Sequence, residues 1–236
     1  MSKRADIREK RRRQRRRRQL ITILIVLGPA LIVLAIIIWP QFAPIGDISV
    51  PEVKSYPMAD GLAMGDPQSP VVIEEYSDFL CAFCGTFHGS TLGQIVEQYV
   101  ATGQVYFVFN PLPPRRENSI QSAHASLCAS EQGQFWQYAD ILFANQASIY
   151  STRNIDRLLE AMAETADLDI DRFQSCMREN RYEGQIQDIY SIAISYGIES
   201  TPSFLINGNL FRGAQPFSEF QAEIEAALSE AASPSP

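Results

Sequence analysis

Two cysteines separated by two residues, Cys81 and Cys84, constrain the fold of this chain more than any other feature. They follow an apolar run over residues 71–76, whose β-branched side chains predict a strand. Apolar residues at helical spacing continue over residues 87–99, so the pair is expected at the N-terminus of a helix. A second predicted strand over residues 105–109 completes a β-α-β unit, in which the two strands run parallel.

This placement predicts a redox-active dithiol. The spacing puts both sulfurs on one side of the first helical turn, close enough to form a disulfide. At the start of the helix, unpaired N–H groups and the helix dipole stabilise the thiolate of Cys81 and lower its pKa. Cys84 lies one turn further in and suits a resolving role. Such a pair can pass a disulfide to a substrate through a mixed-disulfide intermediate.

Other chemistries of paired cysteines fit this sequence less well. A zinc site would need a second close pair, but Cys128 and Cys176 are isolated, and haem attachment needs a histidine where Gly85 stands. A structural disulfide between the pair stays open, although so short a loop constrains the unfolded chain little. A Cys–His hydrolase with His88 or His124 as base also stays open, although packing or surface roles are commoner for histidine. We therefore expect no metal, and no cofactor besides the redox-active disulfide itself.

The rest of the chain predicts a helical block followed by a hairpin. Apolar stripes at helical spacing recur over residues 112–197. An Asn-Gly pair between the β-type runs 204–206 and 210–212 is typical of a hairpin turn, and a last helix is expected over residues 218–228. If the hairpin joins the first two strands, the fold class is α/β: a small mixed sheet with helices on its faces, interrupted by the helical block.

The N-terminal region predicts a membrane anchor. Residues 20–39 carry no charge, and a helix of that length spans about 30 Å, the thickness of a bilayer core. Residues 1–19 carry eleven Lys or Arg against two acidic residues, so the positive-inside rule keeps them in the cytoplasm. A cleaved signal peptide is the alternative, but its apolar region is shorter, and Pro40 and Pro44 make a poor cleavage site. We expect a single-pass protein of the cell membrane with an extracytoplasmic domain.

The part after the anchor is expected to contain a linker, one domain and a tail. Residues 40–54 are rich in Pro and Gly and predict a linker, residues 55–231 a domain, and residues 232–236 a disordered tail. The chain after residue 19 carries nine basic and 25 acidic residues. It lacks the basic face that nucleic-acid binding requires, so no nucleic-acid partner is expected.

Several motifs resemble, in order, those of DsbA-type thiol–disulfide oxidoreductases, which have a thioredoxin fold. The resemblance covers about residues 58–228, and exported members with a membrane anchor exist in that family. The matching segments are residues 65–67, 70–73, 75–79, 81–84, 131–136, 142–146 and 197–208. The resemblance implies a thioredoxin-like mixed sheet with an inserted helical subdomain, here preceded by the predicted transmembrane helix.

The resemblance also implies a role for individual residues. Cys81 resembles the exposed nucleophile and Cys84 the resolving cysteine. Thr201 and Pro202 resemble the threonine and cis-proline of the loop that faces the redox pair and contacts the substrate backbone. Glu75 matches a partly buried acidic residue that helps proton transfer at the resolving cysteine. A solvated strand position is the alternative for Glu75.

The chain departs from the family between the two cysteines. Many members have Pro after the first cysteine, and strong oxidants often have His before the second, where this chain has Ala82 and Phe83. Neither side chain carries charge or donates a hydrogen bond. We therefore expect the pKa of Cys81 to lie below about 8.5, but to be less depressed than in the strongest oxidants.

The remaining cysteines, Cys128 and Cys176, match positions that pair in some family members. An exported protein with an even number of cysteines favours a structural disulfide. Two buried free thiols are the alternative.

The function that the resemblance implies is a membrane-tethered dithiol oxidase acting on newly exported proteins. Its reduced pair would be reoxidised by a quinone-linked membrane partner of the DsbB or VKOR type. A disulfide reductase or isomerase is one alternative. A non-redox substrate-binding or chaperone module, with an apolar groove beside Thr201 and Pro202, is the other.

Overall fold

The computed structural model describes residues 13, 16–18, 21–22, 25, 27–29, 31–36 and 45–232. The chain divides into two compact units, residues 1–44 and 45–236. The described residues of the first unit are helical. Among the described residues, no helix combines the length and apolar character needed to span a bilayer. The predicted anchor over residues 20–39 and the predicted tail both include residues outside the described part.

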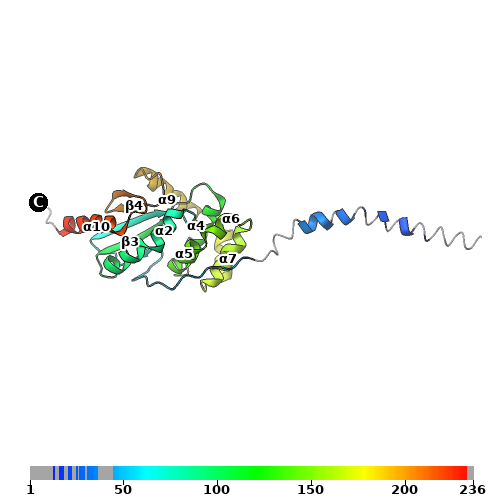
Figure 1. Cartoon of the computed structure of the whole chain (residues 1–236), viewed down its shortest axis with the longest axis horizontal. Coiled ribbons are helices and arrows are strands. Elements are labelled where there is room, and N and C mark those ends of the chain that lie inside the picture. The colour runs from blue at the N-terminus through cyan, green and yellow to red at the C-terminus, as the bar shows by residue number, and fades with distance from the viewer. Residues whose placement is uncertain are drawn as a thin grey trace, which may run out of the picture. The chain divides into compact units, whose positions relative to one another are not determined.

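The second unit is built on a five-stranded mixed sheet in the order β1-β3-β2-β4-β5 (Figure 1). Strands β2 and β3 are parallel over their whole length, from Val71 opposite Val105 to Ser77 opposite Pro111. The other neighbours are antiparallel. The strands are β1 Ala63–Met64, β2 Val71–Ser77, β3 Val105–Pro111, β4 Ser203–Ile206 and β5 Asn209–Arg212. The sheet thus joins the predicted β-α-β unit to the predicted hairpin.

The helix after β2 is interrupted, although the apolar spacing predicts one continuous helix. It forms α2 (Ala82–Gly89), α3 (Thr91–Ile95) and the π-helical turn η1 (Val96–Val100). At the break, Ser90 leaves helical geometry with φ −138° and ψ −67°. Its hydroxyl donates a hydrogen bond of 2.7 Å to the carbonyl of Thr86. Serine competes in this way with backbone hydrogen bonding, a local effect that apolar periodicity does not report.

Helices fill the chain between β3 and β4, as the apolar stripes predict. They are α4 (Glu117–Ser130), α5 (Phe135–Ala144), α6 (Gln146–Ser151), α7 (Ile155–Thr165), α8 (Ile170–Arg178) and α9 (Glu183–Ser195). The last helix is α10, Phe217–Ala232. Asp169 caps α8, because its carboxylate accepts a hydrogen bond from the backbone N–H of Arg172.

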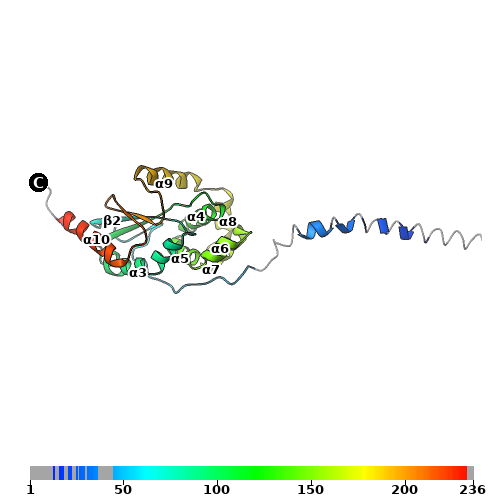
Figure 2. The ribbon, with the colours of Figure 1, turned by 45° about the horizontal axis from the view of Figure 1, so that its top comes forward.

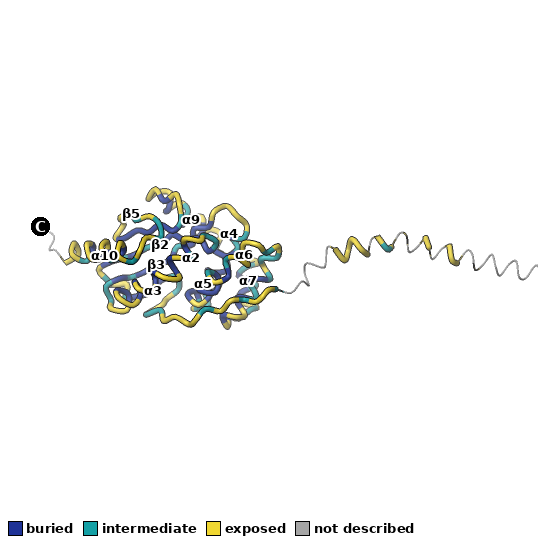
Figure 3. Tube along the Cα trace, in the orientation of Figure 1, coloured by how far each residue is buried: buried dark blue, intermediate teal, exposed yellow. Residues whose placement is uncertain are grey.

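The two faces of the sheet are covered by different helices. Figure 2 shows α9 on one side and α3 and α10 on the other. Alternate residues of β2 therefore enter two cores: Ile73 joins the large core with Phe87 and Phe220, whereas Tyr76 joins a smaller one with Ile189. Strands β1 to β4 are largely buried, whereas the edge strand β5 is partly exposed (Figure 3). This packing places the C-terminal end of β2 beside the start of α2.

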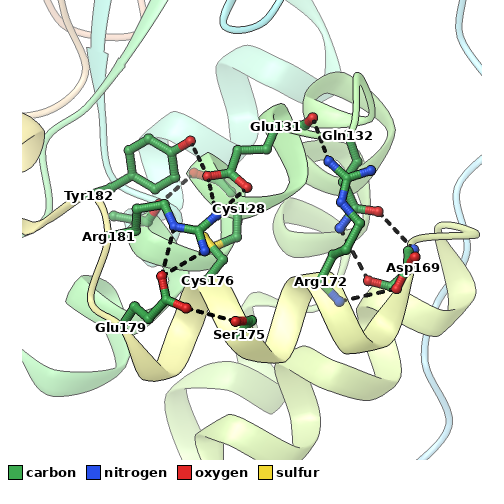
Figure 4. Close-up of a disulfide and its surroundings, with 12 residues drawn as sticks. Cys128, Glu131, Gln132, Asp169, Arg172, Ser175, Cys176, Glu179, Arg181 and Tyr182 are labelled. Atoms are coloured by element: carbon green, nitrogen blue, oxygen red, sulfur yellow. Dashed lines mark hydrogen bonds and ion pairs between the residues drawn. A yellow bond between two sulfur atoms is a disulfide. The ribbon is translucent and has the colours of Figure 1, made fainter.

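Cys128 of α4 and Cys176 of α8 form a disulfide, the pairing that the resemblance implies. Both residues are buried, and their Cα atoms lie 5.8 Å apart. A polar network lies beside the bridge (Figure 4). Within it, Arg181 contacts Glu131 and Glu179 at 2.7 Å each.

Part of the predicted linker packs against the domain. The backbone N–H and carbonyl of Ser49 each make a hydrogen bond of 2.8 Å with the side chain of Asn145. Lys54 contacts Asp140 at 2.7 Å, and the Tyr56 hydroxyl donates to the same carboxylate at 2.8 Å. We call residues 45–57 the strap. The folded unit therefore begins before residue 55, because these contacts hold the strap on the surface of α5 and α6.

The disulfide should contribute strongly to stability. Its two cysteines are separated by 48 residues. In the chain-entropy model a loop of that length corresponds to about 4 kcal/mol. Replacing both residues by alanine should therefore lower the free energy of unfolding by up to about 4 kcal/mol in a urea titration. Cys81→Ala with Cys84→Ala, the matched control, should keep this bridge. An unchanged free energy in the bridge variant would contradict its structural role.

Candidate active site

The redox pair lies at the junction of β2 and α2, as the sequence predicts. Cys81 is the N-cap residue of α2, with extended geometry at φ −77° and ψ 120°. Its backbone N–H donates to the carbonyl of Asp78 at 3.0 Å, and its own carbonyl accepts from the N–H of Gly85 at 3.1 Å. Cys81 is half-buried and Cys84 is buried. One sulfur is therefore open to a partner while the other is enclosed.

The two thiols have opposite electrostatic environments. A hydrogen bond from Cys84 is the largest of the contacts that lower the pKa of Cys81 to about 5, against the opposing effect of partial burial. The N–H groups of Phe83 and Cys84 and the side chain of Thr201 lower it further. Burial and the neighbouring thiolate raise the pKa of Cys84 above its usual range. At neutral pH the reduced pair is therefore a thiolate at Cys81 and a thiol at Cys84.

This pKa agrees in direction with the expectation from the sequence. It lies between about 7, the value of the thioredoxin nucleophile, and about 3.5, that of the strongest oxidant. Ala82 and Phe83 contribute no side-chain charge, so the lowering comes from the Cys84 thiol, the backbone N–H groups at the helix N-terminus and Thr201.

The proline loop packs against the redox pair. The peptide bond between Thr201 and Pro202 is cis. Cys81 Sγ lies 3.4 Å from the carbonyl oxygen of Thr201, to which it donates a hydrogen bond when it is protonated. Strand β4 starts at Ser203, directly after Pro202, and Ser203 lies opposite Tyr76 of β2. Pairing of β2 with β4 is therefore what brings two segments distant in sequence together.

Gln146, at the start of α6, holds the first turn of α2. Its side-chain amide donates to the carbonyl groups of Phe79 at 2.7 Å and Cys81 at 2.9 Å. A Cβ atom at Gly85 would lie 2.6 Å from the Gln146 amide oxygen, so a larger residue there would displace the Gln146 side chain. No sequence pattern indicated a role for Gln146, because nothing local shows that residues 65 apart meet.

Glu75 is fully buried on β2, which excludes the solvated alternative. One carboxylate oxygen, Oε2, lies 3.1 Å from Nε2 of His88, which is also buried. The charge of Glu75 raises the pKa of Cys84, so the carboxyl acts on the resolving thiol. No pattern in the sequence placed His88 in the redox site. Its position four residues after Cys84, on the same face of α2, is the signal that could have indicated it.

Asp78 places a second carboxyl beside the nucleophile. It is 5% exposed, and burial is the main cause that raises its pKa to about 6. The Cys81 thiolate raises it further, whereas the nearby Leu80 backbone N–H, the Ser119 hydroxyl and the charge of Arg116 lower it. This carboxyl therefore changes charge near neutral pH, next to the reactive sulfur.

The structure thus brings together the predicted residues Cys81, Cys84, Thr201, Pro202 and Glu75. The predicted structural pair is separate, because its cysteines join α4 to α8 within the helical block.

Comparison with known proteins gives a family and several relatives. The sequence profile of the family described as Thioredoxin matches residues 58–226. The "Na(+)/H(+) antiporter NhaA 3" of Salinispora tropica is 32% identical over 168 residues, which are 71% of this chain and 24% of the antiporter. The chain therefore spans about a quarter of the length of that relative.

Two further similarities point to disulfide chemistry. The "Probable disulfide bond formation protein D" of Bacillus anthracis is 22% identical over 63% of this chain and 70% of its own length. The crystal structure of alpha-DsbA1 from Wolbachia pipientis matches with a TM-score of 0.65 and 25% identity, covering 75% of this chain and 94% of that protein. These similarities support the thiol–disulfide oxidoreductase class.

Replacing Asp78 by asparagine should lower the pKa of Cys81 by about 0.5–1, because a negative charge next to the thiolate is removed. A thiolate absorbance titration of the reduced protein measures this. Asp171→Asn, an exposed carboxyl of α8, is the control and should leave the titration unchanged. An unchanged or higher pKa of Cys81 in the Asp78 variant would contradict the assigned repulsion.

The same variant should change stability in a pH-dependent way. The pKa of Asp78 is about 6 in the folded protein and about 3.9 in an unfolded chain. The ionisation of Asp78 therefore destabilises the folded protein. This destabilisation begins above about pH 4 and reaches its full size above about pH 6. Relative to wild type, Asp78→Asn should gain up to about 3 kcal/mol between pH 4 and pH 7 in urea unfolding. A gain that is instead lost as pH rises would contradict this sign.

Proposed function

Because this chain belongs to the thioredoxin family, we propose that it is an extracytoplasmic thiol–disulfide oxidoreductase that forms disulfides in exported proteins. The observation that carries the proposal is the pKa of about 5 for Cys81, a half-buried thiol at a helix N-terminus. A stabilised thiolate favours the reduced state of the pair, and a pair that favours reduction is a strong oxidant. This supports oxidation of substrates over their reduction.

The reaction transfers two electrons from substrate to enzyme. A substrate thiolate attacks Cys81 Sγ, the bond to Cys84 breaks, and Cys84 leaves as a thiolate that takes up a proton. A second substrate thiolate then attacks the substrate sulfur of the mixed disulfide. The substrate disulfide forms and Cys81 leaves as its stabilised thiolate. The low pKa of Cys81 makes it a good leaving group in this second step.

Reoxidation reverses these roles. The Cys81 thiolate attacks the disulfide of an electron acceptor, and Cys84 loses its proton and attacks Cys81 Sγ. The enzyme disulfide forms again and the acceptor leaves as a dithiol. A quinone-linked membrane protein of the DsbB or VKOR type is the acceptor that we propose, on the family resemblance described above.

Two features beside Cys81 suit contact with a protein substrate. The ring of Phe83 is 69% exposed, directly next to the redox pair. On the other side, the loop of Thr201 and Pro202 packs against Cys81. The name of the Bacillus relative, a disulfide bond formation protein, supports the same kind of substrate for this chain.

The proposal includes a membrane anchor over residues 20–39. The absence of charge in this segment and the basic run before it support the assignment. A segment similar to this domain also occurs in a protein named as a Na⁺/H⁺ antiporter. Tethering would raise the effective concentration of the domain near a membrane-bound acceptor.

Oxidation of a reduced, unfolded test protein measures the proposed activity. Wild type, supplied in its disulfide form, should generate native disulfides, and Cys81→Ser should generate none because the nucleophile is lost. Cys84→Ser, once joined to substrate through Cys81, should hold the mixed disulfide because the resolving thiol is absent. Activity on a scrambled substrate but not on a reduced one would favour an isomerase. Full biological activity of the variant that carries both Cys81→Ser and Cys84→Ser would instead leave binding as the function.

Membrane extraction tests the anchor. The full-length chain should stay with membranes in alkaline carbonate and be released by detergent, because about 20 apolar residues span the bilayer core. A variant lacking residues 20–39 should be recovered without detergent. Release of the full-length chain by carbonate would contradict the anchor and leave the redox proposal intact.

A further inference from the structure

We propose that His88 is a positioning residue of the redox site, which holds the carboxyl group of Glu75 where that group exchanges a proton with Cys84. The inference rests on the proposed function, because it assigns a role within the same thiol–disulfide step. It concerns a residue that lies outside the CxxC motif and the proline loop.

The Glu75–His88 pair is buried among apolar side chains. Glu75 is 0% exposed and His88 is 3% exposed. The sheet neighbours of Glu75 are Phe109 on β3 and Phe204 on β4, and neither side chain forms conventional hydrogen bonds. Within the described part of the chain, Nε2 of His88 is the hydrogen-bond partner of the Glu75 carboxyl, while the second oxygen has none.

The His88 ring is fixed in place by aromatic neighbours. It stacks on Phe143 of α5, with ring centroids 4.0 Å apart and planes at 27°. The ring of Phe109 meets it edge-on at 5.6 Å, and that of Phe87 at 5.8 Å. A buried carboxyl without a partner is costly, and a partner that cannot rotate holds it in one orientation. The packing therefore determines where the Glu75 oxygens lie.

Cys84 is the group that needs a proton acceptor. Burial raises the pKa of its thiol, yet the thiol must ionise before it can attack Cys81 Sγ. In that step the S–H bond of Cys84 breaks, the Cys84–Cys81 bond forms, and the bond from Cys81 to the departing sulfur breaks. The proton passes to Glu75, and the departing thiolate carries away the electron pair. In its Nε2–H tautomer His88 donates to Oε2 of the Glu75 carboxylate, which leaves Oε1, an oxygen without a hydrogen-bond partner, to take up the proton of Cys84.

Charged groups lie near the backbone of His88 and along a groove that this residue lines. His88 lines a groove of about 430 Å³ together with Lys54 and Glu97. The Lys54 ammonium donates to the His88 carbonyl at 3.4 Å. The titratable groups around the pair are Cys84 on α2, Lys54 and Tyr56 on the strap, Asp140 on α5, and Glu97 on η1. Glu75 is the one that hydrogen-bonds the imidazole, so changes at His88 should act through it.

The test separates the step of Cys84 from that of Cys81. Reduced full-length protein is mixed with excess oxidised glutathione and quenched with acid for mass spectrometry. In the first phase Cys81 attacks glutathione disulfide and becomes glutathionylated. In the second phase Cys84 displaces glutathione and closes the enzyme disulfide. The rate of the second phase is measured between about pH 5 and pH 9, on both sides of neutrality.

His88→Phe keeps an aromatic ring in the stack and removes both nitrogens. It should slow the second phase about 10-fold or more at pH 7. The difference in rate from wild type should become smaller at higher pH, because hydroxide then replaces Glu75 as the base. His88→Gln keeps an amide able to bond Glu75 and should recover part of the rate. The first phase should not change, because other groups stabilise the Cys81 thiolate. His124→Phe, at the other histidine of the chain, is the matched control and should leave the second phase unchanged.

The decisive comparison uses Glu75→Gln as background. If His88 acts through Glu75, His88→Phe should cause no further slowing there. An equal slowing in both backgrounds, or an unchanged second phase in the wild-type background, would overturn the inference. If His88→Phe does not fold by circular dichroism, the pH profile of His88→Gln in both backgrounds decides. Wild type that never closes its disulfide would contradict the proposed function instead.

Discussion

The hydrogen bond between the Cys84 thiol and the Cys81 thiolate is the interaction on which the rest of the site depends. It is the largest contribution to the low pKa of Cys81. It requires one sulfur at the free N-terminus of α2 and the other buried one turn later. Strand β2 ends just before the N-terminus of α2, and the side chain of Gln146 donates a hydrogen bond to the carbonyl of Cys81. The sheet, the helix and the helical block therefore converge on one pair of sulfur atoms.

The helical block takes part in the site rather than only extending the domain. It supplies Gln146 to the start of α2 and Phe143 to the stack on His88. The strap contacts the same block through Asn145 and Asp140, and its Lys54 reaches the carbonyl of His88 near the end of α2. Both ends of the catalytic helix are thus held by residues outside the β-α-β unit. This arrangement explains how a half-exposed thiol can sit in a fixed electrostatic environment.

Local patterns in the sequence predicted the elements that local physics determines. The strand before Cys81 and the Asn-Gly hairpin depend on neighbours along the chain, and both are present. The break at Ser90 was not predicted from the sequence, because the apolar spacing continues through it. Contacts between distant residues were not predicted either, such as Gln146 with Cys81 and His88 with Glu75. Of these contacts, only the one made by His88 has a local indication in the sequence: His88 lies four residues after Cys84, on the same face of the helix.

The reduction potential of the Cys81–Cys84 pair in the full-length protein decides between oxidation and reduction of substrates. A stabilised Cys81 thiolate favours the reduced pair and makes its disulfide oxidising. We therefore expect a potential towards about −120 mV, the value of the strong oxidant DsbA. A potential near about −270 mV, that of thioredoxin, would contradict this mechanism and assign the pair to reduction.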